Sequence, residues 1–527
     1  MAKVINGPVI IISIFLVLIL SSPCRADINA NVDNKLIAPL PDPYINNYEI
    51  TANVLPGYNQ YLDLVNGYSI NYPASMNVDP SQLQLRTVIA DNNTRIEIYR
   101  DDFTGSIHSA TAYMQYSNRF LNNRSTHYAQ VNKTISVNGL KVHLLQWQRN
   151  KLLTVVNDHN YYLSAEITKS SKEVYTVFIK SSLPVDGYIP LIQSFAVANK
   201  QGNPGLNPSY QRRSRELQAE TSEFFQKYFG NEATLKWGIF EPSAPERLDY
   251  LHLLEKQMDC KFDFLILYKT FDAPFPAEEL SRAYQEQRYV QLTLQTMFIN
   301  GNNANITYDI LNGKYDGFFT DYAKKARDFG HPLLFRLNNE MNGDWCVYSS
   351  YYSSKDTELY KAVWQHVYKI FTANQANNVL WVWNPNDLSF PGFKWNHALN
   401  YFPGEAYVDI IGLTGYNTGS YYPGEYWREF TSIYDPLYQQ YSAIFDYPFI
   451  ISEFGCNSVG GSKAVWIGDM FANMKKYSGI KAAIWFNGTD VDGNGMPARI
   501  YRLDENNTIL NAFRKGFASP VKETSKE

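Results

Sequence analysis

Two glutamates more than a hundred residues apart stand in contexts that suit chemistry better than structure. Glu340 ends the run Phe335-Arg-Leu-Asn-Asn-Glu, and Glu453 ends the run Phe449-Ile-Ile-Ser-Glu. A carboxylate at the C-terminal end of a buried strand contributes little to stability, whereas barrel enzymes build their active sites there. Two such groups facing one pocket can cleave a glycosidic bond, because one protonates the leaving oxygen while the other attacks or activates water.

Eight apolar runs of strand length recur in the C-terminal half, with helical stretches between several of them. Eight βα units in about 250 residues are typical of a TIM barrel. A doubly wound open sheet is the alternative, but no Gly-rich phosphate turn follows the first run. The sequence therefore predicts an α/β fold, a (β/α)8 TIM barrel preceded by a smaller α+β domain. The runs are Trp237–Glu241, Phe262–Tyr268, Tyr289–Gln295, Pro332–Leu337, Val379–Trp383, Val408–Leu413, Pro448–Glu453 and Lys481–Phe486.

The chain has 527 residues, more than one ordinary domain, so we expect two cores. Residues 27–60 are rich in Asn, Pro and Asp and predict a loose lead-in. Residues 61–200 mix alternating strand patterns with a helical pattern and predict an α+β accessory domain. A Gly/Pro/Asn-rich run and an Arg-rich run predict a linker over 201–232, which leaves 233–520 for the barrel. The segment Gly67–Ala74 and the strands after it look like the PsbP/Mog1 modules, a resemblance that implies no function.

Residues 1–26 have the pattern of a targeting segment. Lys3 precedes an apolar stretch, Val9–Leu20, that is short for a bilayer span. Small and polar residues follow, with a cleavage point after Ala26. We expect a signal peptide and a secreted or cell-surface protein; the alternative is an uncleaved N-terminal anchor, which would be the chain's contact with a membrane.

Composition excludes several classes of partner. The formal net charge of −4 gives no reason to expect nucleic acid or an anionic membrane. Aromatic residues make up 15% of the chain and suit stacking on sugar rings, although tyrosine-rich secreted proteins also use tyrosine in cores and on surfaces. The four cysteines are too few and too scattered for a disulfide framework.

We expect neither a metal nor a cofactor. The histidines and cysteines show no metal-ligand spacing. Asp490–Gly495 opens like a calcium loop, but the twelfth position is Tyr501 where a bidentate Glu belongs, so a polar loop explains it better.

Four motifs follow one another between Trp237 and about Phe517: Arg336–Trp345, Val379–Asn386, Val408–Tyr416 and Ile451–Gly455. With these motifs the chain resembles glycoside hydrolase family 26, a clan A family of β-mannanases and β-glucanases. The resemblance implies that Glu340, after the fourth strand, is the acid/base and that Glu453, on the seventh, is the nucleophile of a retaining mechanism. Retention requires the two carboxylates about 5–5.5 Å apart.

Five residues are predicted to bind substrate, two of them from this resemblance and the others from their positions. Asn339 stands where family 26 usually has His, and its amide could bind the sugar 2-hydroxyl; this departure weakens the transfer of β-mannan specificity. Tyr416 matches the tyrosine that hydrogen-bonds the nucleophile, and Trp485 matches the tryptophan under the sugar being attacked. Trp345 lines the site, and Arg336 orients Glu453. For Tyr416 and Trp345 the alternative is an ordinary role in the core, and for Arg336 it is a buried structural ion pair.

The sequence thus predicts a secreted retaining endo-β-glycanase whose partner is a β-linked polysaccharide, such as β-mannan, glucomannan or mixed-linkage β-glucan. The competing hypothesis is a non-catalytic polysaccharide-binding or cell-surface protein on the same barrel. Transglycosylation would use the same residues as hydrolysis. Oligomeric state and the role of the N-terminal domain stay open.

Overall fold

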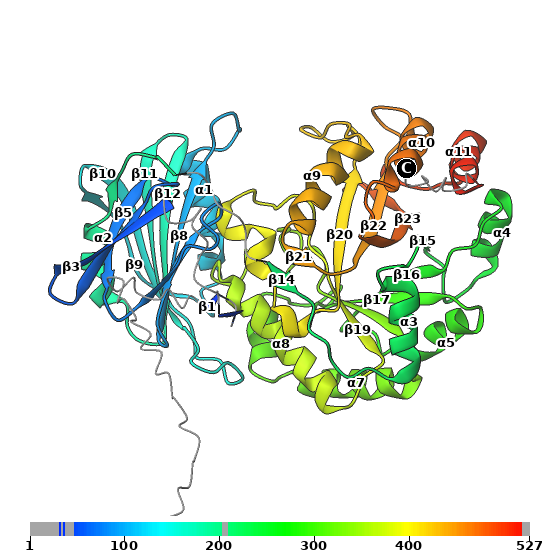
Figure 1. Cartoon of the computed structure of the whole chain (residues 1–527), viewed down its shortest axis with the longest axis horizontal. Coiled ribbons are helices and arrows are strands. Elements are labelled where there is room, and N and C mark those ends of the chain that lie inside the picture. The colour runs from blue at the N-terminus through cyan, green and yellow to red at the C-terminus, as the bar shows by residue number, and fades with distance from the viewer. Residues whose placement is uncertain (1–30, 33–34, 37–46, 203–208, 519–527) are drawn as a thin grey trace, which may run out of the picture.

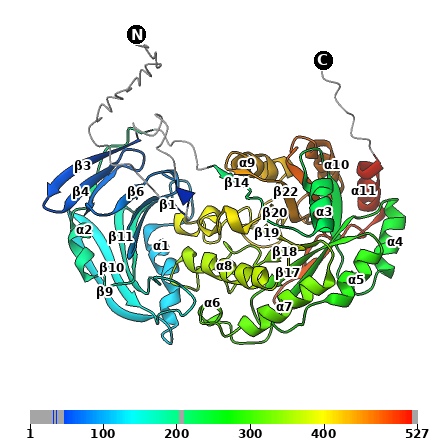
Figure 2. The ribbon, with the colours of Figure 1, turned by 60° about the horizontal axis from the view of Figure 1, so that its bottom comes forward.

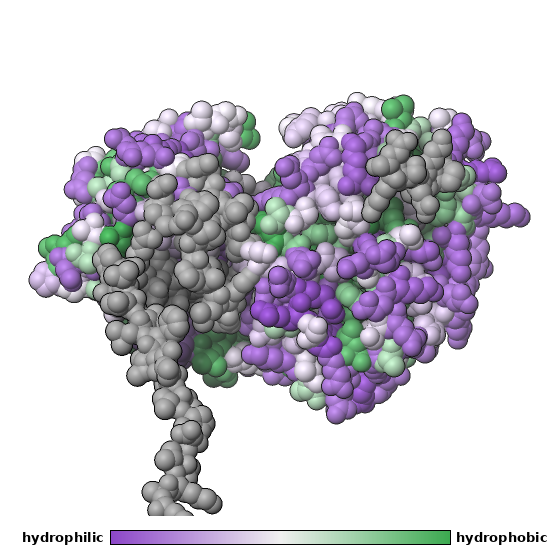
Figure 3. Space-filling view, viewed as in Figure 1, coloured by the Kyte–Doolittle hydropathy of each residue, from purple (hydrophilic) through white to green (hydrophobic). Residues whose placement is uncertain are grey.

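The computed structural model describes residues 31–32, 35–36, 47–202 and 209–518, so the expected signal segment lies outside the described residues. These residues form two lobes in contact, an N-terminal sheet domain and a C-terminal barrel (Figure 1). In the described ranges, no helix is both long and apolar enough to cross a bilayer. On the face seen in Figure 3, hydrophilic side chains dominate the outside of the barrel.

The N-terminal domain contains a seven-stranded and a four-stranded antiparallel sheet. The strand orders are β6-β7-β8-β12-β11-β10-β9 and β13-β5-β4-β3. The short strands β1 (Asn31–Val32) and β2 (Lys35–Leu36) pair only with each other. The other elements are β3 (Tyr48–Leu55), β4 (Tyr58–Asp63), β5 (Tyr68–Pro73), β6 (Asn77–Asp79), β7 (Thr87–Ala90), β8 (Thr94–Asp102), β9 (Tyr128–Val137), β10 (Leu140–Gln148), β11 (Tyr161–Ser170), β12 (Glu173–Ser181), β13 (Ala196–Val197), α1 (Ala110–Ser117) and α2 (Ile189–Gln193).

Strand alternation gives the seven-stranded sheet two different faces, because successive side chains point to opposite sides. Ile96 and Ile98 of β8 join Val177 and Ile179 of β12 in a core shared with the four-stranded sheet. The opposite face packs Tyr99 and other aromatic residues against α1 and against the barrel. The domain is therefore built to be covered on both faces.

The second lobe is a closed eight-stranded parallel barrel, as predicted. Each apolar run forms a strand: β15 (Lys236–Phe240), β16 (Phe264–Thr270), β17 (Tyr289–Gln295), β18 (Leu333–Leu337), β19 (Val379–Trp383), β20 (Ile410–Asn417), β22 (Phe449–Cys456) and β23 (Ile480–Phe486). The helices are α4 (Asp249–Met258), α5 (Ala277–Gln285), α6 (Ile306–Leu311), α7 (Asp316–Phe329), α8 (Thr357–Ala373), α9 (Phe430–Ser442), α10 (Lys463–Met474) and α11 (Asn507–Ala518). A hairpin of β24 (Thr489–Val491) and β25 (Pro497–Ile500) follows the last barrel strand.

The expected lead-in over 27–60 is wrong in its second half. β3 begins at Tyr48 and pairs with β4, so the sheet domain starts before residue 61. Asn- and Pro-rich composition indicates a loop, but here tertiary pairing of β3 overrides it.

The expected linker over 201–232 is also wrong for its described residues. β14 (Tyr210–Gln211) pairs in parallel with β21 (Phe445–Asp446), and α3 (Ala219–Phe229) follows. Phe224, Phe225 and Phe229 of α3 pack with the side chains that fill the barrel, such as Ile266 and Ile450. The segment is therefore part of the barrel domain rather than a spacer. Figure 2 shows the lobes from a second direction, again in contact.

Candidate active site

Glu340 lies just past β18, at the C-terminal end of the barrel. Its backbone N–H donates to the Asn384 carbonyl oxygen at 2.8 Å. Its φ is +52°, and Asn338 two residues earlier has φ +51°. A left-handed backbone costs a non-glycine residue about 1–3 kcal/mol and persists only where the surroundings hold it, which is common at functional sites.

The carboxyl of Glu340 is held in its protonated form at neutral pH. Burial raises the pKa of Glu340 to about 8, and the negative charges of Glu453 and Asp387 act in the same direction. Arg336 and the Trp345 indole oppose this shift. A carboxyl that carries a proton near pH 7 and faces an anion is suited to general acid catalysis.

Glu453 lies on β22, the seventh strand, and is almost fully buried. The Arg336 guanidinium donates to its Oε2 at 2.9 Å, and the Tyr268 hydroxyl donates to the same oxygen. Arg336 also donates to Thr293 Oγ1 at 2.8 Å and to Asn384 Oδ1 at 2.7 Å, so the orientation of its guanidinium group is fixed. These bonds hold the Glu453 carboxylate in one orientation.

Arg336 is itself fully buried, with no exposed side-chain surface. The predicted orientation of Glu453 by Arg336 is therefore confirmed, and the burial of Arg336 keeps it from contacting a sugar directly.

Asn384 connects the two carboxylates. Its backbone oxygen accepts from Glu340, and its side-chain oxygen accepts from Arg336, which in turn holds Glu453. Gly412 on β20 makes room for it, since a Cβ there would lie 2.6 Å from the Asn384 Cβ. Asn384 was not singled out from the sequence, although it follows the fifth strand as Glu340 follows the fourth.

Asn339 lies beside Glu340 at the rim. Its amide nitrogen is 3.4 Å from Glu340 Oε2, and its amide oxygen accepts from Gln295 Nε2 at 3.1 Å. The Tyr348 hydroxyl donates to its backbone oxygen at 2.8 Å. The Asn339 amide is therefore oriented with its N–H groups on the side of Glu340.

The hydroxyl that donates to Glu453 belongs to Tyr268, and the expected donor Tyr416 is wrong in that role. Tyr416 is half-buried near the site: burial, and next the charge of Glu453, raises its pKa. Its ring packs 4.9 Å from Tyr501 and 5.9 Å from Phe486. Tyr268, on the second strand, was missed because nothing in its local sequence marks it; only barrel closure brings it to Glu453.

Trp485 does not face the site, so its expected role under the sugar is wrong. It is fully buried, packs against Phe454 and Trp466, and donates to the Tyr501 carbonyl oxygen at 2.8 Å. Neighbouring residues of a strand point to opposite sides, and Phe486 is the one at the rim. Phe486 is half-buried and stacks on Phe240 with ring centroids 4.6 Å apart.

Trp345 is the most exposed aromatic ring of the predicted set, with 50% of its surface accessible. It folds back over Gly343, where an added Cβ would lie 2.5 Å from the indole ring. Its ring centroid is 5.3 Å from that of Phe390. Trp345 thus offers an open aromatic face next to Glu340.

Among the described residues, no group of three or more His, Cys, Asp or Glu side chains could hold a metal ion. The described cysteines, Cys260, Cys346 and Cys456, are unpaired thiols.

A closed barrel with a protonated carboxyl after its fourth strand and an ion-paired carboxylate on its seventh has the construction of a glycoside hydrolase. Residues 288–488 match the model of Glycosyl hydrolase family 26. The match lies wholly within the barrel and covers less than half of the chain. The resemblance of the N-terminal domain to PsbP/Mog1 modules stays a prediction.

Curated relatives match parts of the chain. The chain is 32% identical over 243 residues to Endoglucanase H of Acetivibrio thermocellus, covering 40% of this chain and 27% of that protein. It is 35% identical over 106 residues to a Mannan endo-1,4-beta-mannosidase of Bacillus subtilis, covering 19% of this chain and 28% of that protein. The chain therefore spans less than a third of the length of each. A solved GH26 beta-mannanase from Bacteroides ovatus aligns at 15% identity with a TM-score of 0.43, over 57% of this chain and 93% of that one.

Proposed function

We propose that the chain is a secreted retaining endo-β-glycanase acting on a β-linked polysaccharide. Two substrate classes are candidates: β-mannan or glucomannan, and mixed-linkage β-glucan. The names of the two relatives, an endoglucanase and a mannan endo-1,4-beta-mannosidase, support this pair of substrate classes. One observation carries the proposal: the pKa of Glu340 is raised to about 8 beside Glu453, whose carboxylate is ion-paired with Arg336.

In the first step, a Glu453 oxygen attacks the anomeric carbon while Glu340 gives its proton to the glycosidic oxygen, and the C–O bond to the leaving sugar breaks. In the second step, Glu340, now a carboxylate, takes a proton from water. The resulting hydroxyl oxygen attacks the anomeric carbon and releases Glu453. Arg336 and Tyr268 keep Glu453 aimed throughout, and Asn339 is placed to bind the sugar 2-hydroxyl.

The test is reducing-sugar release from a panel of β-mannan, glucomannan, mixed-linkage β-glucan and β-1,3-xylan. Glu453→Ala is the companion variant, and Glu279→Gln, a rim carboxylate that pairs with Lys269 at 2.9 Å, is the control. Activity on one polymer that is lost in Glu453→Ala and kept in Glu279→Gln would fix reaction and substrate class. Binding without release in every case would favour the non-catalytic alternative.

The pH dependence follows from Glu340. Since the protonated form is the acid, kcat/KM should fall as pH rises through about 8, where Glu340 loses its proton. Measuring kcat/KM from pH 4 to 10 on a soluble oligosaccharide should show a basic limb near about pH 8. A basic limb near the ordinary carboxyl pKa would contradict the assignment.

A further inference from the structure

The segment between β18 and α8, residues 338–356, connects the active site to the N-terminal domain. Glu340 is at its beginning, and Ser354 and Lys355 are near its end with φ values of +60° and +57°. Left-handed backbone at two consecutive non-glycine residues requires tertiary contacts to hold it. Both ends of the segment that carries the acid are therefore strained.

The N-terminal domain supplies the contacts at the far end. The Lys355 ammonium donates to Glu166 Oε1 at 3.1 Å and to Asn118 Oδ1 at 2.9 Å. The Trp147 indole N–H donates to Ser354 Oγ at 3.2 Å. These three partners, Glu166, Asn118 and Trp147, all belong to the N-terminal domain, and Glu166 and Trp147 are buried.

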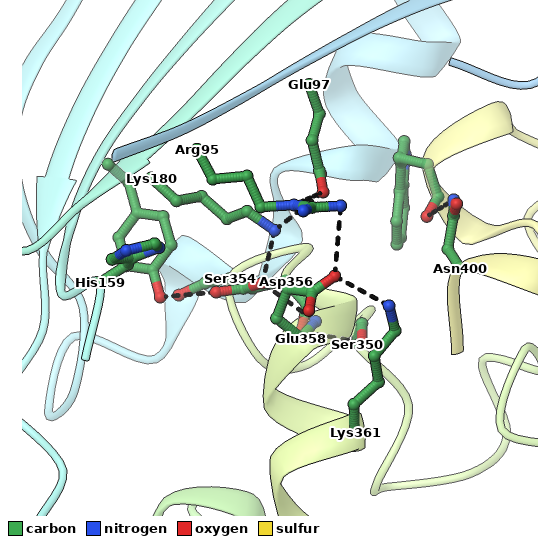
Figure 4. Close-up of polar contacts among 12 residues, drawn as sticks. Arg95, Glu97, His159, Lys180, Ser350, Ser354, Asp356, Glu358, Lys361 and Asn400 are labelled. Atoms are coloured by element: carbon green, nitrogen blue, oxygen red, sulfur yellow. Dashed lines mark hydrogen bonds and ion pairs between the residues drawn. The ribbon is translucent and has the colours of Figure 1, made fainter. Parts of the chain in front are cut away.

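A buried charge network next to this segment fixes the lobes against each other (Figure 4). The Lys180 ammonium bridges Asp356 at 2.8 Å and Glu97 at 3.2 Å. Arg95 pairs with Glu97 at 2.7 Å and lies 3.6 Å from Glu358. Breaking a buried, hydrogen-bonded ion pair is strongly unfavourable, so the N-terminal domain cannot swing freely on the barrel.

The same domain reaches the turn beside Glu340 through α1. The Tyr116 hydroxyl donates to the side chain of Asp344, the residue directly before Trp345. The Tyr352 hydroxyl donates to the Asp344 carbonyl oxygen at 2.5 Å, and the Tyr116 ring lies 5.0 Å from that of Tyr351. The turn that carries Trp345 is thus held from the barrel side and from the other lobe.

We propose that the N-terminal domain is a working part of the active site, in which Tyr116 is a positioning residue that holds the Asp344–Trp345 turn and so keeps the Trp345 indole beside Glu340. The inference rests on the proposed function. Trp345 neighbours Glu340, the acid that protonates the leaving oxygen, so we take the sugars that Tyr116 indirectly orders to be those of the leaving chain. The N-terminal domain acts on the turn that follows Glu340 and not on Glu453.

The test compares Tyr116→Phe with the full-length wild type on the polymer that the panel identifies. The hydroxyl is partly exposed, so its removal should lower kcat/KM by about threefold to tenfold, mainly through a higher KM for long substrates. The Trp345 indole lowers the pKa of Glu340. A loosened turn should therefore shift the basic limb of the pH profile to higher pH, which a merely structural defect would not do.

Two further variants make the outcome decisive. Tyr128→Phe, an exposed tyrosine on β9 of the same domain, should behave as wild type. Asp344→Ala should reproduce the Tyr116→Phe defect. The double variant should be no worse than the larger single change, because both substitutions remove the same contact between Tyr116 and Asp344. Additive losses, or a Tyr116→Phe enzyme with wild-type kcat/KM and pH profile, would overturn the inference while the proposed function stands. If the wild-type chain released no reducing sugar from any polymer, the proposed function itself would be overturned, and this inference with it.

Discussion

Glu340→Ala should lower kcat/KM on the polysaccharide by about 10²–10⁴-fold and leave the first step, release of the leaving group, nearly intact on an activated aryl glycoside. A sugar alcohol is a poor leaving group that needs the Glu340 proton, whereas a dinitrophenolate leaves without one. Because the pKa of Glu340 is raised to about 8, the proton is present at the pH of the assay. The first step on the aryl glycoside should remain fast, and the second, which needs Glu340 as base, should become slow.

The measurement is pre-steady-state release of the dinitrophenolate, where a burst followed by slow turnover is expected. Because the dinitrophenolate needs no proton, the burst rate should show no basic limb from Glu340 in either enzyme, whereas wild-type kcat/KM on the polysaccharide should fall above about pH 8. Glu453→Ala is the matched comparison: without a nucleophile it should show no burst on either substrate. If Glu340→Ala lost activity equally on both substrates, or if Glu453→Ala still showed the burst, the assigned roles would be wrong.

Lys180→Met should destabilise the protein by about 3–5 kcal/mol, since it leaves the buried Asp356 carboxylate without its cation, whereas Glu97 keeps Arg95. Lys180 is fully buried and joins Glu97 of its own domain to Asp356 of the barrel. Asp356 keeps other partners, the Tyr162 hydroxyl at 3.0 Å and the first turn of α8, but none of them carries a positive charge. The loss should therefore fall on the junction of the lobes.

Urea unfolding followed by tryptophan fluorescence measures this change. Lys169→Met is the matched control: its ammonium pairs with Glu173 at 2.9 Å, but 32% of the side chain is exposed, so a loss of about 0–1 kcal/mol is expected. In Lys180→Met the transition should also broaden or split, because the lobes no longer unfold together. Equal losses in the two variants would show that the buried network contributes no more than a surface pair.

The two variants probe different properties of one arrangement. The acid lies at the start of segment 338–356, and the lobes are joined at its end, where Lys180 meets Asp356. A change at the junction should therefore alter activity as well as stability, although its first effect is on unfolding. A polysaccharide that orders the segment would in turn stabilise the junction.

The sequence by itself determined the barrel and the positions of the two carboxylates. The eight apolar runs became the eight strands, and Glu340 and Glu453 follow the fourth and lie on the seventh. Both inferences rest on local signals, since apolar periodicity defines a strand and polar residues at its C-terminal end mark the catalytic rim of any parallel barrel.

Only the tertiary structure decided which neighbours surround those carboxylates. Whether Trp485 or Phe486 faces the rim depends on the stagger with which the barrel closes, because a shift of one residue reverses the side on which every side chain points. Tyr268 donates to Glu453 across 185 positions of sequence, and Tyr116 reaches Asp344 across 228. Such contacts leave no periodicity in the chain. The composition of residues 201–232 indicated a linker, yet apolar burial of α3 against the barrel outweighed it. Local patterns thus fixed the elements, and the long-range packing of buried surface and charge decided how those elements make a site.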